Sequence, residues 1–358
     1  MRCGPKRPPR RHSMDKTYYA KAVAIADRVI RTFEPKMKWM WGEALLGFAL
    51  ALLDEHEDAD RYTAFLRGYC DYYVQHPPVV DQSDTAAPGL ITFMMQKKTG
   101  DAGYAALTAK VLDYVRNEPR LIEDSVNHLG NSFIGKLYPK SIWVDSLMMF
   151  SVFPSLYAKY ANDAELLTIS ARQPRVMAKY MMDPQDGLWY HSYWVKQKTH
   201  YPRRKLYWAR GNGWVVASLP MILENIGNHP ERAGIEAIFQ TTCAAVLPLM
   251  RPDGTFHTLL GQKKTYRELS ATALIASGFM QGYRMGLLDE RFKDAGVAAF
   301  RAVVDAFKDG PSLPEVSDPT IPVPLFPYLG YVLVPRRADW SYGIAAVLFA
   351  AIAYDRLD

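Results

Sequence analysis

The chain of 358 residues contains only three cysteines and no long apolar run. Cys3, Cys70 and Cys243 are widely separated and lack the spacing of metal ligands, so we expect reduced thiols and no structural metal. No run of about 20 consecutive apolar residues occurs, which predicts no membrane-spanning helix and no membrane partner. The segment from Met14 onward is typical of an amphipathic helix rather than of the apolar core of a signal peptide. Together these features indicate a cytoplasmic protein.

Several catalytic signatures are missing as well. The histidines are scattered without the pairing of a zinc site, and the sequence contains no serine nucleophile elbow, dinucleotide fingerprint or cysteine–histidine dyad. No segment repeats at a fixed period, which argues against a helical-repeat solenoid. The sequence therefore gives no support to a zinc hydrolase, a serine or cysteine hydrolase, or a dinucleotide-dependent enzyme.

The charge is unevenly distributed along the chain. The formal net charge is +6, but much of the basic excess lies in residues 1–12 and in the run Arg203, Arg204 and Lys205. This distribution is typical of a solvated tail and one loop rather than of a nucleic-acid-binding face. We therefore predict no nucleic-acid partner, while the modest positive charge suits a small anionic substrate.

Helix is the dominant element that the sequence predicts. Apolar residues recur mainly at intervals of three and four, and strand-like alternation is scarce. Proline, glycine and aspartate interrupt these segments and mark their ends. The twelve predicted helices are 15–33, 41–54, 59–75, 86–98, 102–116, 141–160, 163–181, 211–226, 232–250, 268–285, 290–306 and 339–355. Ordered loops and short hairpins, such as 188–193 and 256–260, are expected between them.

The predicted helices alternate in character. Odd-numbered helices carry charge on one face, whereas even-numbered ones are apolar on every side, as in 44–53, 215–222 and 344–352. A helix that is apolar on every side is buried on every side. Six buried and six amphipathic helices in alternation predict an all-α fold, an (α/α)6 barrel with an inner and an outer ring. We expect residues 14–358 to form this single domain and residues 1–13 to form a disordered basic tail.

The predicted barrel brings one set of helix ends together. Its six inner helices run parallel, so their N-termini meet at one mouth. Tryptophans fall near these ends together with acidic side chains and an arginine; they are Trp39, Trp41, Trp143, Trp208, Trp214 and Trp340. Aromatic rings stack on the apolar faces of sugars, and carboxyl groups exchange protons. The sequence therefore predicts a carbohydrate-processing cleft.

Asp145 is the leading candidate for catalysis. It is expected within the apolar helix 141–160, where an unpaired carboxylate is costly, and Trp143 lies two residues before it. No lysine or arginine lies at helical spacing to neutralise it. The structural alternative is an acid that the helix macrodipole stabilises near an N-terminus. Burial would raise the pKa of this carboxyl toward that of a general acid, whereas the dipole would lower it.

Three further residues are candidates for the site. Asp84 precedes the fourth predicted helix, where it either assists catalysis or serves as an N-cap, and Asp81 is its rival. Arg210 belongs to the glycine-containing stretch 208–214. Its guanidinium fork suits a carboxylate or a hydroxyl pair, and the alternative is a structural turn with packed tryptophans. His191 lies on a loop among aromatic residues, where it either contacts a ligand or has a structural role.

Three stretches of the chain resemble a known enzyme family. They are Trp-Val-Asp-Ser-Leu-Met at 143–148, Asp-Gly-Leu-Trp-Tyr-His at 186–191 and Trp-Ala-Arg-Gly-Asn-Gly-Trp at 208–214. Their order and approximate spacing resemble those of glycoside hydrolase family 105, the unsaturated rhamnogalacturonyl hydrolases, which are related to the unsaturated glucuronyl hydrolases of family 88. The resemblance extends over roughly residues 15 to 355, and the stretch at 208–214 is its most specific part.

The resemblance implies an enzyme that hydrates the C4–C5 double bond that a polysaccharide lyase leaves in a terminal uronic acid. In the family an aspartate protonates C4, water adds at C5, and the hemiketal then opens and expels the neighbouring sugar. By resemblance, Asp145 is the general acid and then the base that activates water, and Asp84 assists it. Neither a metal nor an organic cofactor is needed. The implied partner is a small anionic oligosaccharide, an unsaturated uronate disaccharide, and the chain is expected to be a monomer or homodimer.

The resemblance also implies a subsite for the unsaturated uronate. Its predicted residues are Trp41, Trp143, His191, Trp208, Arg210 and Trp214. One departure concerns the neighbouring sugar. Family members tend to carry a His-Lys pair before the Tyr-Pro that precedes the catalytic aspartate, but Ile134 occupies the expected histidine position and His128 lies farther upstream. The identity of the sugar next to the unsaturated uronate is therefore left open. It is either the rhamnose of pectin or another uronate-linked sugar, from ulvan, arabinogalactan or glycosaminoglycan.

Three other functions remain as alternatives. A sugar 2-epimerase of the same barrel class would need two histidines at inner-helix starts, where this sequence has Asp, Trp and Arg instead. An inverting glycosidase would use Asp145 and Asp84 as acid and base, with carboxyl groups roughly 6.5–9.5 Å apart. A non-catalytic oligosaccharide-binding protein would bind without turnover, but binding alone leaves a buried, unpaired Asp145 unexplained.

Overall fold

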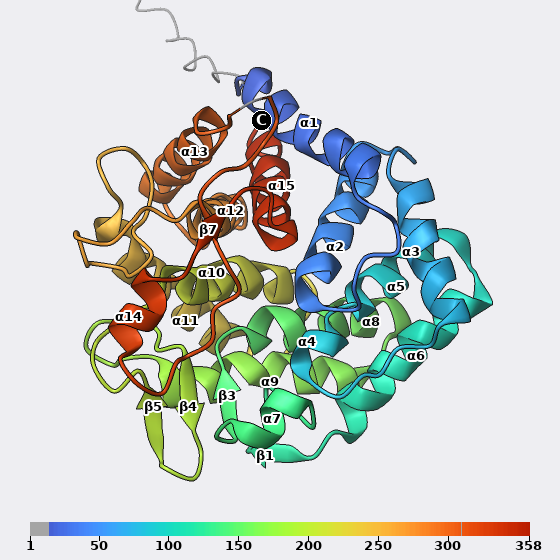
Figure 1. The fold of residues 1–358 in the computed structure, drawn as a ribbon, viewed down its shortest axis with the longest axis horizontal. Helices are drawn as coiled ribbons and strands as arrows, with labels where there is room; N and C mark the ends of the chain where they lie inside the picture. Colours follow the sequence, from blue (N-terminus) through green and yellow to red (C-terminus); the bar gives the residue numbers. More distant parts are fainter. Residues whose placement is uncertain (1–13, 309) are drawn as a thin grey trace, which may run out of the picture.

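The computed structural model describes residues 14–308 and 310–358, and most of them lie in helices (Figure 1). The predicted basic tail, residues 1–13, lies outside the described residues. The longer helices are α1 (Lys16–Thr32), α2 (Trp41–His56), α3 (Thr63–Gln75), α5 (Gly89–Thr99), α6 (Ala102–Asn117), α8 (Val152–Ala161), α9 (Ala164–Met181), α10 (Ala209–Leu223), α11 (Arg232–Val246), α12 (Leu269–Arg284), α13 (Glu290–Asp305) and α15 (Ser341–Asp355). The shorter ones are α4 (Ser83–Ala86), α7 (Phe133–Leu137), the π-helix η1 (Leu147–Ser151), the 3-10 helix η2 (Leu247–Leu249) and α14 (Pro327–Val332).

Alternate helices form an inner ring. Helix α2 packs against α5, and the ring continues through α8, α10, α12 and α15, which contacts α2 again and so closes the barrel. Helices α1, α3, α6, α9, α11 and α13 pack around the outside (Figure 1). Helices α1 and α15, from the two ends of the described chain, lie side by side. This arrangement confirms the predicted (α/α)6 barrel.

The inner helices are buried because they present apolar or small side chains in every direction. Every residue of α10 is buried, and so is every residue of α15 except Asp355, whereas α13 buries one face only. Glycine permits the closest crossing, since a Cβ atom at Gly278 of α12 would lie 2.0 Å from the carbonyl oxygen of Val216 in α10. Any side chain at this position would push the two inner helices apart.

The predicted helix 141–160 is wrong at its beginning. Strand β3 (Ser141–Trp143) replaces the first turn, η1 follows, and regular α-helix begins only at Val152. Strand β3 pairs antiparallel with β4 (Ser192–Trp194), and β4 pairs with β5 (Thr199–Tyr201) in a three-stranded sheet. The isoleucine and tryptophan of β3 favour extended structure. The pairing partner lies far along the chain, so local periodicity does not reveal it.

Proline divides another inner helix. The predicted helix 86–98 corresponds to α5, and the short α4 precedes it, with Pro88 between the two. Pro88 lacks an N–H group and cannot continue the series of helical hydrogen bonds, so α4 and α5 are separate helices although Ala87 and Pro88 both keep right-handed helical dihedral angles. This break leaves α4 as a separate single turn at the mouth of the barrel.

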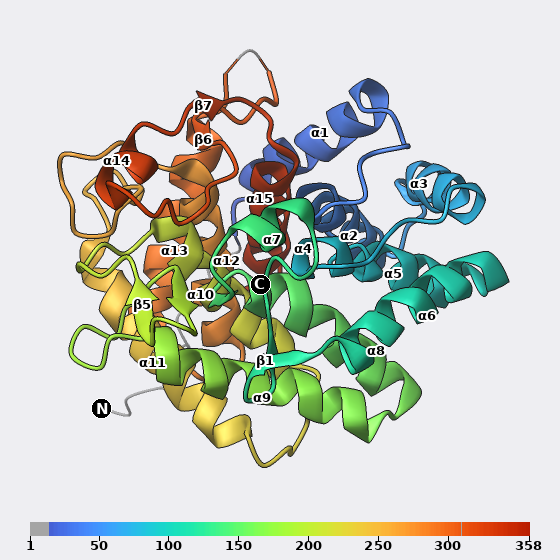
Figure 2. The same cartoon turned by 60° about the horizontal axis from the view of Figure 1, so that its bottom comes forward.

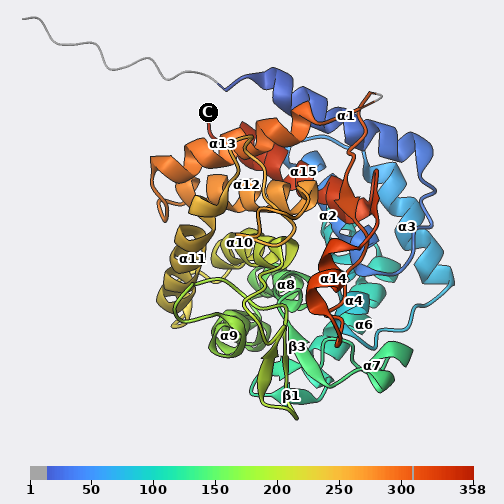
Figure 3. The ribbon, with the colours of Figure 1, turned by 60° about the vertical axis from the view of Figure 1, so that its left-hand side comes forward.

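The long connections contribute structure at one end of the barrel. The remaining strands form two pairs, β1 (Arg120–Ile122) with β2 (Ser125–Val126), and β6 (Val316–Ser317) with β7 (Arg336–Arg337). Helices α7 and α14 and the pair β6–β7 lie toward the same end of the barrel (Figures 2 and 3). Within the described residues, no helix is both long enough and apolar enough to cross a membrane.

Candidate active site

A cavity of about 410 Å³ opens at the N-terminal ends of the inner helices α2, α4 and α10 and of η1. The predicted site residues that line it are Asp84, Asp145, Trp41, Trp143, Trp208 and Arg210. Exposed apolar side chains, those of Phe133, Ile134 and Ile321, also line the cavity and form its rim. The structure therefore brings together carboxyl groups and aromatic rings that are far apart in the sequence.

Asp145 lies in the turn between β3 and η1, and not within a helix as predicted. Its backbone carbonyl accepts hydrogen bonds from the N–H groups of Met148 and Met149, so the residue begins the helical segment. The preceding N–H group, that of Val144, donates to the carbonyl of His191. The strand thus fixes the backbone of Asp145 beside that of His191. Single-turn π-helical segments such as η1 occur frequently at functional sites.

The carboxylate of Asp145 faces a buried imidazole. The Nε2 atom of His191 lies 3.3 Å from Oδ2 of Asp145, and the ring stacks on Trp208 with centroids 4.3 Å apart. On its other side, Nδ1 of His191 lies 3.0 Å from the hydroxyl of Tyr331. Burial raises the pKa of this hydroxyl well above its usual value, so Tyr331 keeps its proton. When the Tyr331 hydroxyl donates a hydrogen bond to Nδ1, the neutral imidazole carries its own proton on Nε2, the nitrogen that faces Asp145.

A second histidine belongs to the site, and the sequence prediction missed it. His128 stacks on Trp143 with centroids 4.4 Å apart, and its Nδ1 lies 2.7 Å from the hydroxyl of Ser146. Its Nε2 lies 3.5 Å from Oδ1 of Asp84. Burial lowers the pKa of His128 to about 4, against the attraction of Asp145, so the ring is neutral near pH 7. Nothing in the sequence around His128 marks it, because its neighbours come from other segments.

The environments of the two carboxyl groups push their pKa values in opposite directions. Burial, and then repulsion by Asp145, raise the pKa of Asp84 to about 8. Burial also raises the pKa of Asp145, but the interaction with His191 outweighs burial, and the pKa lies below the ordinary value. Near pH 7 the free protein therefore holds one proton, on Asp84, and one negative charge, on Asp145. Such a separation is how active sites provide an acid and a base from two like groups.

Asp84, and not its rival Asp81, lies in the cavity. Asp84 is the second residue of α4, and the capping role considered for it belongs to Gln82, whose side chain and that of Thr85 form a reciprocal capping box. Asp81 instead accepts a hydrogen bond from Thr85 and lies outside the cavity lining. The short helix thus frees the Asp84 carboxyl from a structural task and presents it to the cavity.

Arg210 is completely buried and mainly holds a loop. Its Nη1 atom donates to the carbonyl of Ser317 at 3.0 Å, and its Nη2 atom donates to the carbonyl of Asp318 at 3.0 Å. Nη1 also lies 3.5 Å from a carboxylate oxygen of Glu268, which caps α12. Only Nε of Arg210 lacks a hydrogen-bond partner among the described residues. The guanidinium therefore fixes the segment 317–320 over the cavity and leaves its Nε donor without a partner among the described residues.

The glycine-containing stretch 208–214 has a packing reason. A Cβ atom at Gly211 would lie 2.9 Å from the ring of Trp208, so only glycine lets this ring lie against the helix. Asn212 donates to the carbonyl of Trp189 and accepts from the N–H of the same residue, which anchors the segment leading to His191. Trp214 is completely buried, lies edge-on to Trp41 and is outside the cavity lining.

The fold and the paired carboxyl groups define a glycoside hydrolase built on an (α/α)6 barrel. Residues 14–358 match the model of Glycosyl Hydrolase Family 88, and the chain belongs to this family. It is 26% identical over 339 residues to the unsaturated rhamnogalacturonyl hydrolase YesR of Bacillus subtilis, a match that covers 93% of this chain and 95% of that protein.

Two further relatives agree with this assignment. The chain is 25% identical over 255 residues to an unsaturated 3S-rhamnoglycuronyl hydrolase of Alteromonas sp., covering 68% of this chain and 59% of that protein. Its fold matches a crystal structure described as a possible member of the GH105 family from Salmonella enterica, with a TM-score of 0.87, 19% identity and 100% of both chains covered. These comparisons confirm the resemblance noted in the sequence.

Proposed function

We propose that the protein hydrates the C4–C5 double bond of a terminal unsaturated uronic acid and so releases this residue from its neighbouring sugar. The observation that carries the proposal is the pair Asp84 and Asp145, whose pKa values are displaced in opposite directions within one aromatic-lined cavity. The names of YesR and of the Alteromonas relative, both unsaturated uronyl hydrolases, support it.

The proposed reaction adds water across an enol ether. A carboxylic acid proton adds to C4, and the ring oxygen stabilises the positive charge that develops at C5. Water then adds to C5 and gives its proton to the carboxylate left behind, which restores the acid. The hemiketal at C5 opens to a ketone and leaves a hemiacetal at C1. This hemiacetal collapses to an aldehyde as the bond from C1 to the neighbouring sugar breaks, and that sugar leaves as an alcohol. One water molecule is consumed in each turnover.

We propose that Asp145 delivers the proton and that Asp84 stores it in the free enzyme. The two carboxyl groups share one proton, so either can carry it, depending on the surrounding charges. The carboxylate of a bound uronate adds a negative charge to the cavity. If that charge lies nearer to Asp145 than to Asp84, it raises the pKa of Asp145 more and moves the shared proton onto Asp145.

The cavity suits a sugar ring held by its faces. Trp41, Trp143 and Trp208 provide flat surfaces for stacking, and the free Nε donor of Arg210 suits the uronate carboxylate. At the rim, Ile134 replaces the histidine expected from the resemblance and makes this side apolar. An apolar rim favours a neighbour with a methyl group, and we propose rhamnose, which the names of both relatives also support.

We further propose that the substrates derive from pectin and that the enzyme acts in the cytoplasm. The pectin source is supported by the rhamnogalacturonyl name of YesR. The cytoplasmic location rests on the low cysteine content of the sequence, and subcellular fractionation of the native cells tests it.

The test follows the ultraviolet absorbance of the conjugated double bond. Purified protein is mixed with a panel of lyase-generated disaccharides, and the loss of absorbance is recorded for the wild type, for Asp145→Asn and for Asp81→Asn. We expect the wild type and Asp81→Asn to consume at least one disaccharide, and Asp145→Asn to be slower by about 10³-fold. Persistence of the absorbance with every disaccharide would contradict the proposed function.

A further inference from the structure

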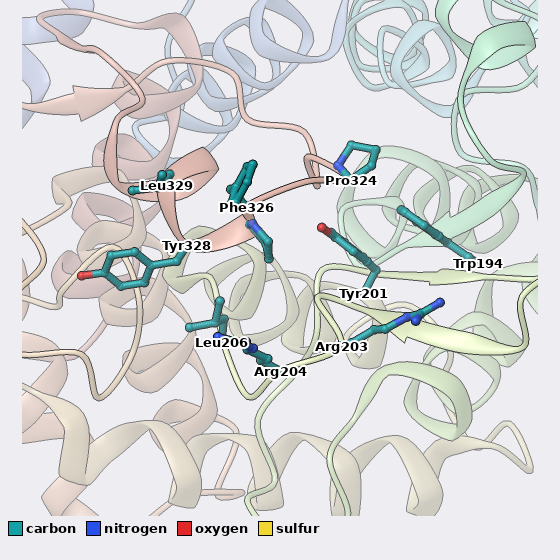
Figure 4. A pocket seen from close by; sticks show the side chains of 10 residues that line it. Trp194, Tyr201, Arg203, Arg204, Leu206, Pro324, Phe326, Tyr328 and Leu329 are labelled. Atoms are coloured by element: carbon teal, nitrogen blue, oxygen red, sulfur yellow. The ribbon is translucent and has the colours of Figure 1, made fainter.

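A second and larger cavity lies outside the active site. It has a volume of about 660 Å³ and lies between the hairpin β4–β5 with the residues that follow it and the segment 324–329, which includes the first turn of α14 (Figure 4). None of the residues that line it is acidic, and two of them, Arg203 and Arg204, are arginines. The charged side chains of this lining are therefore all cationic, whereas the active-site cavity combines the carboxylate of Asp145 with the guanidinium of Arg210.

The two arginines differ from the lysine that follows them. Lys205 is bound to its own protein, because its ammonium lies 2.9 Å from Asp186 and 3.5 Å from Asp183. Arg203 and Arg204 are exposed, and neither forms an ion pair with a carboxylate of the described residues. The basic run therefore offers two available guanidinium groups at the cavity. Guanidinium groups bind carboxylate and sulfate through paired hydrogen bonds.

Aromatic rings complete the lining. On one side Trp194 stacks on Tyr201, with centroids 4.4 Å apart and planes 4° apart. Phe326 and Tyr328 lie on the other side, and Phe326 is 74% exposed. Phe326 also adopts a left-handed backbone with φ of 54°, a strained conformation for a bulky residue. Strain and an exposed aromatic ring at a cavity are both typical of ligand-binding positions.

One segment of chain borders both cavities. Residues 319–321 line the active-site cavity, whereas Pro324 and Phe326 line the second one. Two hydrogen bonds hold the segment between them. The hydroxyl of Tyr138 donates to the carbonyl of Pro322, and the hydroxyl of Tyr201 donates to the carbonyl of Val323. The two cavities are therefore neighbours along this segment of the chain.

Aromatic contacts also connect the two cavities. The ring of Trp143 in the active site packs against that of Tyr138, with centroids 5.6 Å apart, and Tyr138 packs against Trp194, with centroids 5.9 Å apart. Trp194 in turn stacks on Tyr201. The walls of the two cavities are therefore one continuous packed unit, and their spacing is fixed. A fixed spacing is required if both cavities are to hold parts of the same molecule.

We propose that the second cavity is a subsite for an anionic sugar unit of the substrate, remote from the unsaturated uronate and carrying a carboxylate or a sulfate. The inference rests on the proposed function and extends it. It assigns the protein to oligosaccharides that continue beyond a disaccharide and that bear further negative charge.

The test compares short and long substrates in the double variant Arg203→Ala/Arg204→Ala. Lys196→Ala is the matched control, because Lys196 is an exposed cation of the same hairpin outside the cavity lining. The substrates are an unsaturated disaccharide and longer lyase products that are uncharged, carboxylated or sulfated beyond it. We expect the double variant to raise KM about tenfold or more for one or both acidic products. We expect kcat to stay the same for every substrate, and KM to stay the same for the disaccharide and for the uncharged product.

The outcomes separate the inference from the proposed function. A rise confined to the carboxylated product, or to the sulfated one, identifies the anion that the subsite takes. An unchanged KM for every long product overturns the subsite while leaving the hydratase intact, and so does an equal rise for the disaccharide or for the Lys196→Ala control. A wild-type protein that consumes none of the products refutes the proposed function itself.

Discussion

The Nε2 atom of His191 and the Oδ2 atom of Asp145 face each other at 3.3 Å, and neither has a hydrogen-bond partner elsewhere in the described chain. Both atoms are buried, and leaving buried polar atoms unpaired is unfavourable. An arrangement of this kind is unexpected in a purely structural cluster, where close pairs align into hydrogen bonds. It is expected where a substrate or a water molecule completes the geometry.

Removing the hydroxyl of Tyr331 should slow the reaction while leaving binding largely intact. The variant Tyr331→Phe keeps the ring that packs near Trp208 but deletes the partner of His191 Nδ1. The imidazole then loses the group that fixes its tautomer, and we expect kcat to fall about tenfold with little change in KM. Steady-state kinetics with a lyase-generated disaccharide measure both constants. Tyr160→Phe, at an exposed position, serves as the control. Equal kcat values for the two variants would show that the Tyr331 hydroxyl has no role in the mechanism.

The rate should depend on the proton shared by the two aspartates. Because the pKa of Asp84 is raised to about 8, kcat/KM is expected to decrease as the pH rises through about 8, where this proton is lost. In Asp84→Asn the store is absent and only Asp145 titrates, with its lowered pKa. The alkaline limb of the profile should therefore move to lower pH in this variant. An alkaline limb at the same pH in both proteins would exclude Asp84 as the proton store.

The same shift predicts a pH-dependent effect on stability. The folded protein keeps the Asp84 proton up to about pH 8, whereas the unfolded chain releases it near the ordinary pKa of 3.8. The unfolded state thus binds fewer protons in this window, so the Asp84 contribution to stability falls as pH rises from 3.8 to about 8. Asp84→Asn has no such titration, so it escapes this loss of stability. The difference between the Tm of Asp84→Asn and that of the wild type should therefore increase as the pH rises from 3.8 to about 8. Each kcal/mol corresponds to about 1–2 °C for a domain of this size. Scanning calorimetry at several pH values measures the difference, and a constant difference would contradict the assigned shift.

Arg210 should matter for stability more than a surface arginine does. Truncation in Arg210→Ala leaves Glu268 buried without its cation and removes the donors that hold Ser317 and Asp318. Breaking a buried pair in this way is expected to lower the free energy of unfolding by about 3–5 kcal/mol. Arg210→Lys keeps the charge but not the fork, so an intermediate loss is expected. Urea denaturation gives the values, and Arg172→Ala, at a half-exposed surface pair, is the control. A loss no greater than that of the control would contradict the role assigned to Arg210.

The barrel was predictable from the sequence because a helix that is buried on every side is apolar at nearly every position, and this pattern is visible in the local sequence. The segments 44–53, 215–222 and 344–352 are apolar through several turns, and they lie in the inner helices α2, α10 and α15. The start of 141–160 was not predictable in the same way. Its first three residues pair with β4, and no feature of their own neighbourhood distinguishes a buried strand from a buried helix.

The candidate site was predictable to a similar extent and for similar reasons. Asp84, Asp145 and the tryptophans that line the cavity stand out as polar or aromatic residues beside apolar helices. His128 and Tyr331 lie in long connections without periodicity, and only the folded chain brings them to Trp143 and His191. The contacts of Arg210 were hidden for the same reason, since its partners lie more than a hundred positions further along the chain.

The position of Tyr331 on the short helix α14 has a consequence for synthesis. A growing chain that has left the ribosome as far as Val246, the end of α11, already contains Asp84, Asp145 and His191. The groups that complete their surroundings, Glu268 and Tyr331, are made later. The closing helix α15 is made after both of them. Catalytic competence is therefore acquired only after α14 has been made, and a chain truncated before α14 should be inert even where its early helices have formed.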